Sequence, residues 1–138
     1  MMTLGHTVLH KIKLHAMEAW PEECCGVLLG SENGATRRVC DVVPLTNARE
    51  ENRGRRFLVT PEEYRSAERR AKEEGVAVLG FYHSHPDHPA QPSAFDLEHA
   101  MPWFSYVIAS VERGLPTNVR SWVLLDDRSA VRLSAILE

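Results

Sequence analysis

The stretch VAVLGFYHSHPDHPAQPSAFD, residues 76–96, passes from an almost wholly apolar run into a loop rich in histidine and proline. The apolar run predicts a central strand that is covered on both faces. Side chains at i and i+2 of a strand point to the same face, so His83 and His85 should project together where this strand leaves the core. Two parallel imidazoles are half of a tetrahedral metal site. The stretch therefore indicates either a polar turn or a metal centre.

The loop that follows carries a possible third ligand. Ser93 can cap a short helix, and Asp96 then lies in the first turn, where a carboxylate is favoured. Ser-x-x-Asp is a common helix start and by itself indicates no function. Next to two exposed histidines, however, Asp96 can complete a set of three ligands that leaves one position for water, as in catalytic zinc sites. Zinc lowers the pKa of such a water to about 7, which makes it a nucleophile at neutral pH.

A hydrolytic site of this kind also needs a base to accept the proton of the water. The segment WPEECCG, residues 20–26, offers two adjacent carboxylates, Glu22 and Glu23, just before an apolar strand. The residues alone do not choose between them, and an acidic pair after a helix is usually only solvated. Both remain candidates on sequence grounds.

The rest of the chain predicts an α/β domain. We expect a helix over 7–19 capped by Thr7, a second helix after a capping box at Thr60-Pro61-Glu62-Glu63 that stops at Gly75, and a third near Ser93. Strands are expected over 24–30, 37–45, 76–83, 106–111, 122–125 and 131–136, the first two pairing antiparallel. Helices interleaved with strands, followed by a run of strands, indicate a mixed sheet in a single domain spanning 1–138.

Composition and charge argue against several classes of protein. With 138 residues, 43% hydrophobic content and a net charge of −3, the chain has no basic field that would favour nucleic acid. No apolar run approaches the roughly 20 residues of a membrane span, and the start lacks the pattern of a signal peptide. The three cysteines, Cys24, Cys25 and Cys40, form no C-x-x-C pair. They are expected to be buried thiols in a reducing cytoplasm.

The spaced set of residues resembles the JAMM/MPN metalloprotease family. Its elements are a glutamate ahead of a G-[VL]-L-x-G strand (Glu23 in PEECCGVLLG), then H-S-H-P, seven residues, a serine, two residues and an aspartate. The surrounding sequence, TNARE…RF followed by GFYHSHPDHPAQPSAFDLEHA, looks like that of the small stand-alone bacterial members of this family. The resemblance runs from about residue 18 to residue 122. It is specific because the full spaced set is improbable by chance, whereas H-x-H alone is weak.

The resemblance implies a cytidine-deaminase-like α/β fold, with a mixed curved β-sheet flanked by helices, and one zinc ion with a catalytic water. By that resemblance His83, His85 and Asp96 bind zinc. Glu23, preferred to Glu22, acts as general base and later protonates the leaving amine. Ser93 donates its hydroxyl to the oxyanion of the tetrahedral intermediate; losing one such donor typically costs about 10²–10³ in rate.

The resemblance also implies a substrate class. Family members hydrolyse amide or isopeptide bonds after the C-terminal glycines of ubiquitin-like proteins, and the bacterial type is associated with sulfur-carrier proteins. The loop at 46–56 lies where relatives contact their substrate, although it is equally consistent with a solvated loop. The alternative function is a non-catalytic MPN scaffold that binds proteins. A zinc nucleoside deaminase is disfavoured because neither H-x-E nor P-C-x-x-C occurs.

Two further interpretations concern residues near the site. His88 is either an outer ligand or gate, or a plain exposed turn histidine. Trp103 and Tyr106 are expected in the core rather than on a substrate platform. The sequence leaves the oligomeric state and the identity of the substrate open.

Overall fold

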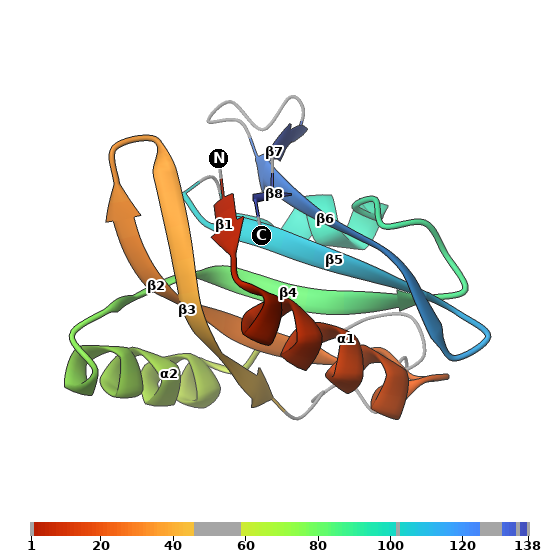
Figure 1. Cartoon of the computed structure of the whole chain (residues 1–138), viewed down its shortest axis with the longest axis horizontal. Coiled ribbons are helices and arrows are strands. Elements are labelled where there is room, and N and C mark those ends of the chain that lie inside the picture. The colour runs from red at the N-terminus through yellow and green to blue at the C-terminus, as the bar shows by residue number, and fades with distance from the viewer. Residues whose placement is uncertain (1, 46–58, 102, 125–130, 135, 138) are drawn as a thin grey trace.

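The structure is a computed structural model that describes residues 2–45, 59–101, 103–124, 131–134 and 136–137. The elements, in chain order, are β1 Met2–Leu4, α1 His6–Ala19, β2 Cys25–Asn33, β3 Thr36–Leu45, α2 Pro61–Glu73, β4 Ala77–Pro86, α3 Ala94–His99, β5 Ser105–Glu112, β6 Leu115–Leu124, β7 Val131–Ser134 and β8 Ile136–Leu137 (Figure 1). In the described part of the chain, no helix has the length and apolar character needed to span a membrane.

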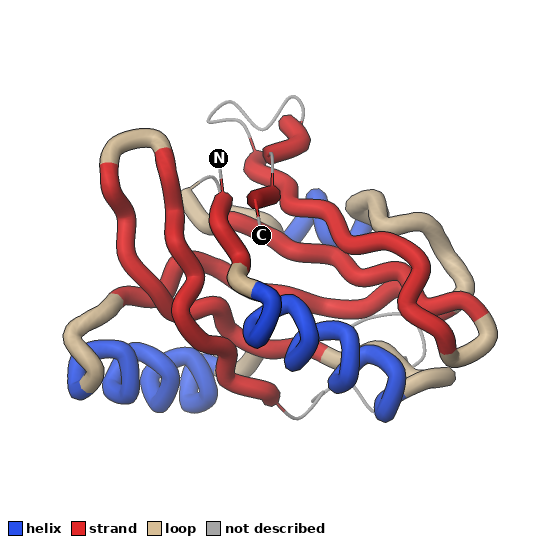
Figure 2. The backbone as a smooth tube through the Cα atoms, viewed as in Figure 1, coloured by secondary structure: helices blue, strands red, loops and turns tan. Residues whose placement is uncertain are grey.

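One eight-stranded sheet contains all the strands found in the described residues, in the order β7-β6-β5-β4-β2-β3-β1-β8. The pairs β4/β5, β1/β3 and β1/β8 are parallel, and the remaining pairs are antiparallel. A single residue separates β7 from β8 in the chain, so the two ends of this order must lie close together. The sheet therefore curves until it is nearly closed, as the bent strands of Figure 2 show. The predicted α/β class with a mixed curved sheet is confirmed.

The two long helices cover opposite faces of the sheet. Leu28 and Tyr82 belong to the core cluster that includes the buried residues of α1, whereas Val27 and Phe81 belong to the cluster that includes those of α2. Because neighbouring residues of a strand point to opposite faces, this alternation places α1 and α2 on different sides. Figure 1 shows α1 in front of the strands and α2 beside β2 and β3. The prediction of a strand covered on both faces is confirmed.

Strand β4 lies at the centre of the sheet, between antiparallel β2 and parallel β5. Its fully buried Tyr82 packs so closely on β2 that a Cβ at Gly26 would lie 2.1 Å from the ring carbon Cε1. The Tyr82 hydroxyl lies 2.8 Å from Nδ1 of His15 on α1. Only glycine at position 26 allows this packing, which joins α1, β2 and β4. These contacts place the end of β4, where the histidines lie, in a fixed position.

The local signals of α2 are confirmed. Thr60 caps the helix in a capping box with Glu63, and Pro61 occupies the first helical position. The helix α3 begins after Ser93, as expected, and the hairpin of β2 with β3 is antiparallel in the predicted segments. The caps depend on residues three positions apart, and the hairpin depends on two apolar runs joined by a short polar turn, so local sequence signals were sufficient.

Other expectations were wrong. The cap of α1 is Gly5 and not Thr7, because the chain enters the helix directly from β1, which was not predicted. Strand β6 begins at Leu115, well before 122, because a tight turn with positive φ at Arg113 and Gly114 leads directly into it. The prediction missed this first half because its residues are mostly exposed and do not show an apolar strand pattern. The segment 131–136 forms parts of two strands, and Cys40 is exposed rather than buried.

Candidate metal centre

His83 and His85 lie side by side at the end of β4. Both are buried, with exposed fractions of 1% and 7%, and their Nε2 atoms are 3.2 Å apart. They follow Phe81 at two-residue steps, so they project from the α2 face of the sheet, where Phe81 packs. Ser84 is on the opposite face. The strand period thus brings the two imidazoles together, as the H-x-H spacing predicted.

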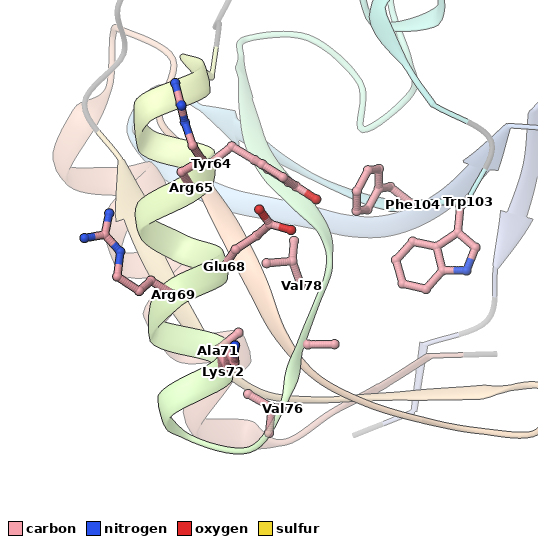
Figure 3. A pocket seen from close by; sticks show the side chains of 11 residues that line it. Tyr64, Arg65, Glu68, Arg69, Ala71, Lys72, Val76, Val78, Trp103 and Phe104 are labelled. Carbon is pink, nitrogen blue, oxygen red and sulfur yellow. The ribbon is translucent and has the colours of Figure 1, made fainter.

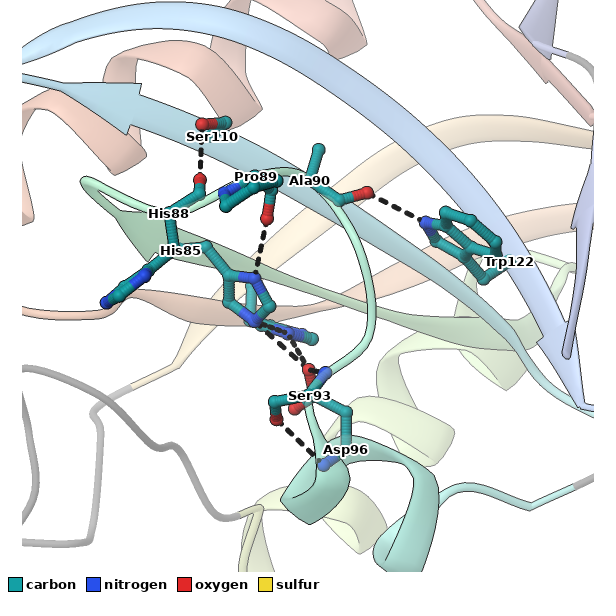
Figure 4. A network of polar contacts seen from close by, with 9 residues as sticks. His85, His88, Pro89, Ala90, Ser93, Asp96, Ser110 and Trp122 are labelled. Atoms are coloured by element: carbon teal, nitrogen blue, oxygen red, sulfur yellow. Dashed lines mark hydrogen bonds and ion pairs between the residues drawn. The ribbon is translucent and has the colours of Figure 1, made fainter.

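Asp96 reaches the histidines from the first turn of α3 (Figure 4). Its Oδ2 atom lies 3.2 Å from Nε2 of His83 and 3.0 Å from Nε2 of His85. The same oxygen accepts a hydrogen bond of 2.8 Å from the backbone N–H of Ser93, whose hydroxyl accepts the N–H of Asp96. The capping box and the candidate ligand are therefore one arrangement: the cap holds the carboxylate that faces both imidazoles.

Glu23 lies in the same group, and Glu22 does not. One carboxylate oxygen of Glu23 and one ring nitrogen of each histidine lie within 4.8 Å of one another, and Glu23 is 3% exposed. Glu22 is exposed. The pairing of β2 with β4 explains the difference, since it sets Cys25 opposite His83. Glu23 comes two residues before Cys25 and so lies on the same side as His83, whereas Glu22 does not. The sequence left open which of Glu22 and Glu23 lies near the histidines, and the register of β2 against β4 places Glu23 there.

Ser84 holds the segment that carries Glu23. Its hydroxyl accepts the backbone N–H of Cys24 at 2.8 Å, and its own N–H donates to the Cys24 carbonyl at 3.1 Å. Ser84 is fully buried. The residue between the two histidines therefore fixes the chain just after Glu23, a role the sequence analysis missed. Strand alternation did place Ser84 on the opposite face, but the partner it meets there lies 60 positions away.

A cation fits the donor atoms of this group. Nδ1 of His85 lies 3.0 Å from the carbonyl oxygen of Pro89, which can only accept, so Nδ1 carries the hydrogen. In a neutral imidazole Nε2 then holds a lone pair, and this lone pair faces the Asp96 carboxylate. Such atoms repel unless positive charge lies among them. Ligand atoms around a tetrahedral zinc are about 3.3 Å apart, close to the separations here, and two imidazoles with a carboxylate are a donor set of catalytic zinc.

The electrostatics favour the ligand forms of these side chains. Burial lowers the pKa of His83, and Asp96 offsets this only in part. Burial raises the pKa of Asp96, but the His83 ring and the hydrogen bond from the Ser93 N–H outweigh burial and hold this pKa well below its usual range. The contribution of His83 requires a charged ring, which burial disfavours, whereas the Ser93 N–H acts regardless. Neutral His83 and ionised Asp96 at neutral pH are the states that metal binding needs.

The two adjacent cysteines do not supply a reactive thiolate. Burial raises the pKa of Cys24 to about 11 and that of Cys25 to about 12. Both thiols are therefore protonated at neutral pH, and a protonated thiol is a poor nucleophile and a poor metal ligand. The chemistry of this end of β4 rests on the histidines and carboxylates.

His88 and Trp103 lie apart from the group. The His88 side chain is exposed and points away from His85 and Asp96 in Figure 4. Trp103 is 49% exposed with the Arg37 guanidinium 4.3 Å from its ring, so its expected core position was wrong, while Tyr106 is half-buried. Trp103, Phe104 and one side of α2 line a groove of about 800 Å³ over the start of β4 (Figure 3). None of the four grouped residues lines this groove.

The chain matches the family model described as prokaryotic homologs of the JAB domain (Prok-JAB) over residues 6–125. The chain belongs to the JAB/MPN family. The predicted family is thereby confirmed, and the match includes every residue of the histidine and carboxylate group.

Curated relatives share part of the chain. Desampylase of Haloferax volcanii is 38% identical over 91 residues, which cover 65% of this chain and 63% of the relative. Desampylase of Pyrococcus furiosus is 31% identical over 84% of this chain and 76% of the relative. The probable TtuB-protein conjugate cleaving protease of Thermus thermophilus is 32% identical over 73% and 64%. The matched region spans slightly less than two thirds of the Haloferax and Thermus proteins.

Solved structures share the fold. A protein of Desulfitobacterium hafniense is 34% identical with a TM-score of 0.87, covering 99% of this chain and 92% of the other. A JAB1/MPN domain protein of Archaeoglobus fulgidus has a TM-score of 0.59 at 19% identity, covering 99% and 98%. The second likeness supports the fold alone.

Proposed function

We propose that this protein is a zinc-dependent hydrolase of amide or isopeptide bonds. The observation that carries the proposal is the convergence of four side chains at the end of β4. Oδ2 of Asp96 lies within 3.2 Å of both imidazoles, and a carboxylate oxygen of Glu23 lies within 4.8 Å of the histidines. His83, His85 and Asp96 would hold the zinc, which when bound supplies Lewis acidity that makes water a nucleophile near neutral pH.

Glu23 is proposed as the base. Its carboxylate takes a proton from the attacking water as the water oxygen bonds to the carbonyl carbon of the substrate, and it returns a proton to the nitrogen as the C–N bond breaks. Its position supports this role, because it is buried beside the ligands while Ser84 fixes the next residue through two hydrogen bonds.

Ser93 is proposed as a donor to the oxyanion that develops on the substrate. Its hydroxyl oxygen accepts the N–H of Asp96, and this contact does not use the hydroxyl hydrogen. The side chain is exposed, so a substrate carbonyl can approach it. A donor held in place before the reaction begins stabilises the charge without reorganisation.

The proposed substrate is a ubiquitin-like or sulfur-carrier protein whose C-terminal glycine is joined by an amide or isopeptide bond to another protein or to a C-terminal tail. The enzyme would cleave the bond after that glycine. The support is that relatives named desampylase and a probable TtuB-protein conjugate cleaving protease share this region of the chain. The loop at 46–56, which was considered for substrate contact, lies outside the described residues. The non-catalytic scaffold remains the outcome to be excluded by experiment.

The test begins with zinc stoichiometry by elemental analysis after zinc loading. Wild type and His88→Ala should hold one zinc, whereas His83→Ala/His85→Ala should hold none. His88→Ala is the matched control because this histidine lies in the same loop but points away. Loaded wild type should then cleave an isopeptide conjugate of a ubiquitin-like protein. Absence of specific zinc in wild type would refute the hydrolase, and zinc binding without any cleavage of such conjugates would refute the substrate class.

A further inference from the structure

We propose that Ser110 and Trp122 are positioning residues for His85. They hold the Pro89 carbonyl in place, so that the His85 imidazole keeps its hydrogen on Nδ1 and presents the Nε2 lone pair to the metal centre. The inference rests on the proposed function, because it concerns residues that serve the same zinc site. Neither residue belongs to the spaced motif, and neither touches the ligand atoms.

The contacts lie on both sides of Pro89 (Figure 4). The Ser110 hydroxyl donates to the carbonyl of His88 at 2.5 Å, and the indole N–H of Trp122 donates to the carbonyl of Ala90 at 3.0 Å. The carbonyl between these two accepts from Nδ1 of His85 at 3.0 Å. Pro89 has no N–H of its own, and its ring restricts φ, so its orientation depends on how its neighbours are held.

Both donors come from the sheet and not from the loop. Ser110 lies on β5 directly opposite His85 in the parallel pairing with β4, and it is 2% exposed. Trp122 lies on β6, the next strand. The start of the loop is tied as well, since the Asp87 carboxylate accepts the backbone N–H of Arg113 at 2.8 Å. Residues 87–90 are therefore held from the β5 and β6 strands and the turn between them.

The hydrogen on His85 has two possible places. On Nδ1 it bonds to the Pro89 carbonyl, and on Nε2 it would bond to the Asp96 carboxylate, 3.0 Å away. Only the first arrangement leaves a lone pair on Nε2 for a metal. A carbonyl that is fixed in place favours the first, while a mobile one lets the carboxylate draw the hydrogen to Nε2. Losing the outer partner of a metal-binding histidine typically weakens metal binding about 10- to 100-fold.

The first measurement is the tautomer of His85 in the metal-free full chain, from ¹⁵N chemical shifts of the imidazole. Wild type should hold a larger share of the hydrogen on Nδ1 than the two variants do. Ser110→Ala and Trp122→Phe, which remove one donor each, should both shift the ring toward the form protonated on Nε2. The matched controls are Ser121→Ala and Trp103→Phe: Ser121 is a buried serine on β6, and Trp103 is a tryptophan away from the loop. Both controls should give the wild-type spectrum.

The second measurement is zinc affinity by competition with a chromogenic chelator. Ser110→Ala and Trp122→Phe should each weaken zinc binding about tenfold, with the controls unchanged. Wild-type tautomer and wild-type affinity in both variants would overturn the inference and leave the zinc site intact. Wild type that binds no zinc would instead overturn the proposed function, while the tautomer measurement would still decide the role of the two residues.

Discussion

Replacing Ser84 with alanine tests how the fold holds Glu23 in place. The hydroxyl of Ser84 accepts the backbone N–H of Cys24 at 2.8 Å in a fully buried site. Alanine keeps the strand and the second contact, in which the N–H at position 84 donates to the Cys24 carbonyl at 3.1 Å. The variant therefore removes one acceptor and leaves one buried donor without its partner.

The magnitude follows from that unpaired donor. A buried N–H that loses its acceptor costs about 1–3 kcal/mol, and removal of a single hydroxyl leaves little cavity to add to it. Unfolding entropy of roughly 2.1 cal/mol/K per residue amounts to about 0.3 kcal/mol/K for 138 residues. The unfolding midpoint should fall by about 3–10 °C. Turnover should fall more than zinc affinity, because Cys24 directly follows the proposed base while the ligands lie elsewhere.

The assay is thermal and urea unfolding of the metal-free protein, with zinc affinity and turnover measured on the loaded form. Ser121→Ala is the matched control: this serine is also fully buried, and its hydroxyl has no hydrogen-bond partner within the described part of the chain. Its replacement should be neutral or slightly stabilising. If the two variants were equally stable and equally active, the contact from Ser84 to Cys24 would contribute nothing and the reasoning would fail.

Three further outcomes are expected. Glu23→Gln should lower turnover about 10²–10⁴-fold with zinc retained, while Glu22→Gln changes little; an active Glu23→Gln enzyme would move the base elsewhere. Zinc should be lost on acidification, because a protonated imidazole cannot bind it. Burial lowers the pKa of His83 below 6.5, so zinc release should occur below pH 6.5. Release at or above pH 6.5, measured by elemental analysis, would contradict this expectation. Asp41, hydrogen-bonded to Lys11 and paired with a second cation, has a lowered pKa. Its contribution is therefore present above an unfolded pKa of about 3.9 and is lost as the pH falls through the folded value. Asp41→Asn should lower the free energy of unfolding by about 0.5–1 kcal/mol at pH 7, a small value because these partly exposed pairs are screened by solvent. Near pH 2, where the carboxyl is protonated, the variant should change it by almost nothing. An equal difference in urea unfolding at both pH values would exclude the ion pairs as the cause.

Much of the architecture could be predicted from sequence because its signals are local. The capping boxes at Thr60 and Ser93 depend on residues three positions apart, and the hairpin of β2 with β3 depends on two apolar runs and a polar turn. Strand β6 shows where such signals end. Its first half is mostly exposed, so it lacks the apolar pattern that marks a strand, and only its pairing with β5 makes it one.

Some features of the candidate site also follow from local sequence, and others do not. The side-by-side placement of His83 and His85 follows from the two-residue period of any strand, and the place of Asp96 in the first turn of α3 follows from the cap at Ser93. These relations are properties of the backbone over a few residues, so the sequence by itself determined them. Which of Glu22 and Glu23 lies beside the histidines depended on the register of β2 against β4, which no local rule contains.

Tertiary structure alone decided what surrounds the candidate ligands. The Ser84 hydroxyl meets a backbone group 60 positions away, and the carbonyls on either side of the one that faces His85 accept hydrogen bonds from donors on β5 and β6. Backbone carbonyls and N–H groups occur at nearly every residue and therefore leave no mark in a sequence. Which of them comes within hydrogen-bonding distance of a side chain is set by how the strands pair and how the loop between β4 and α3 is held against them, and those depend on contacts across the whole sheet.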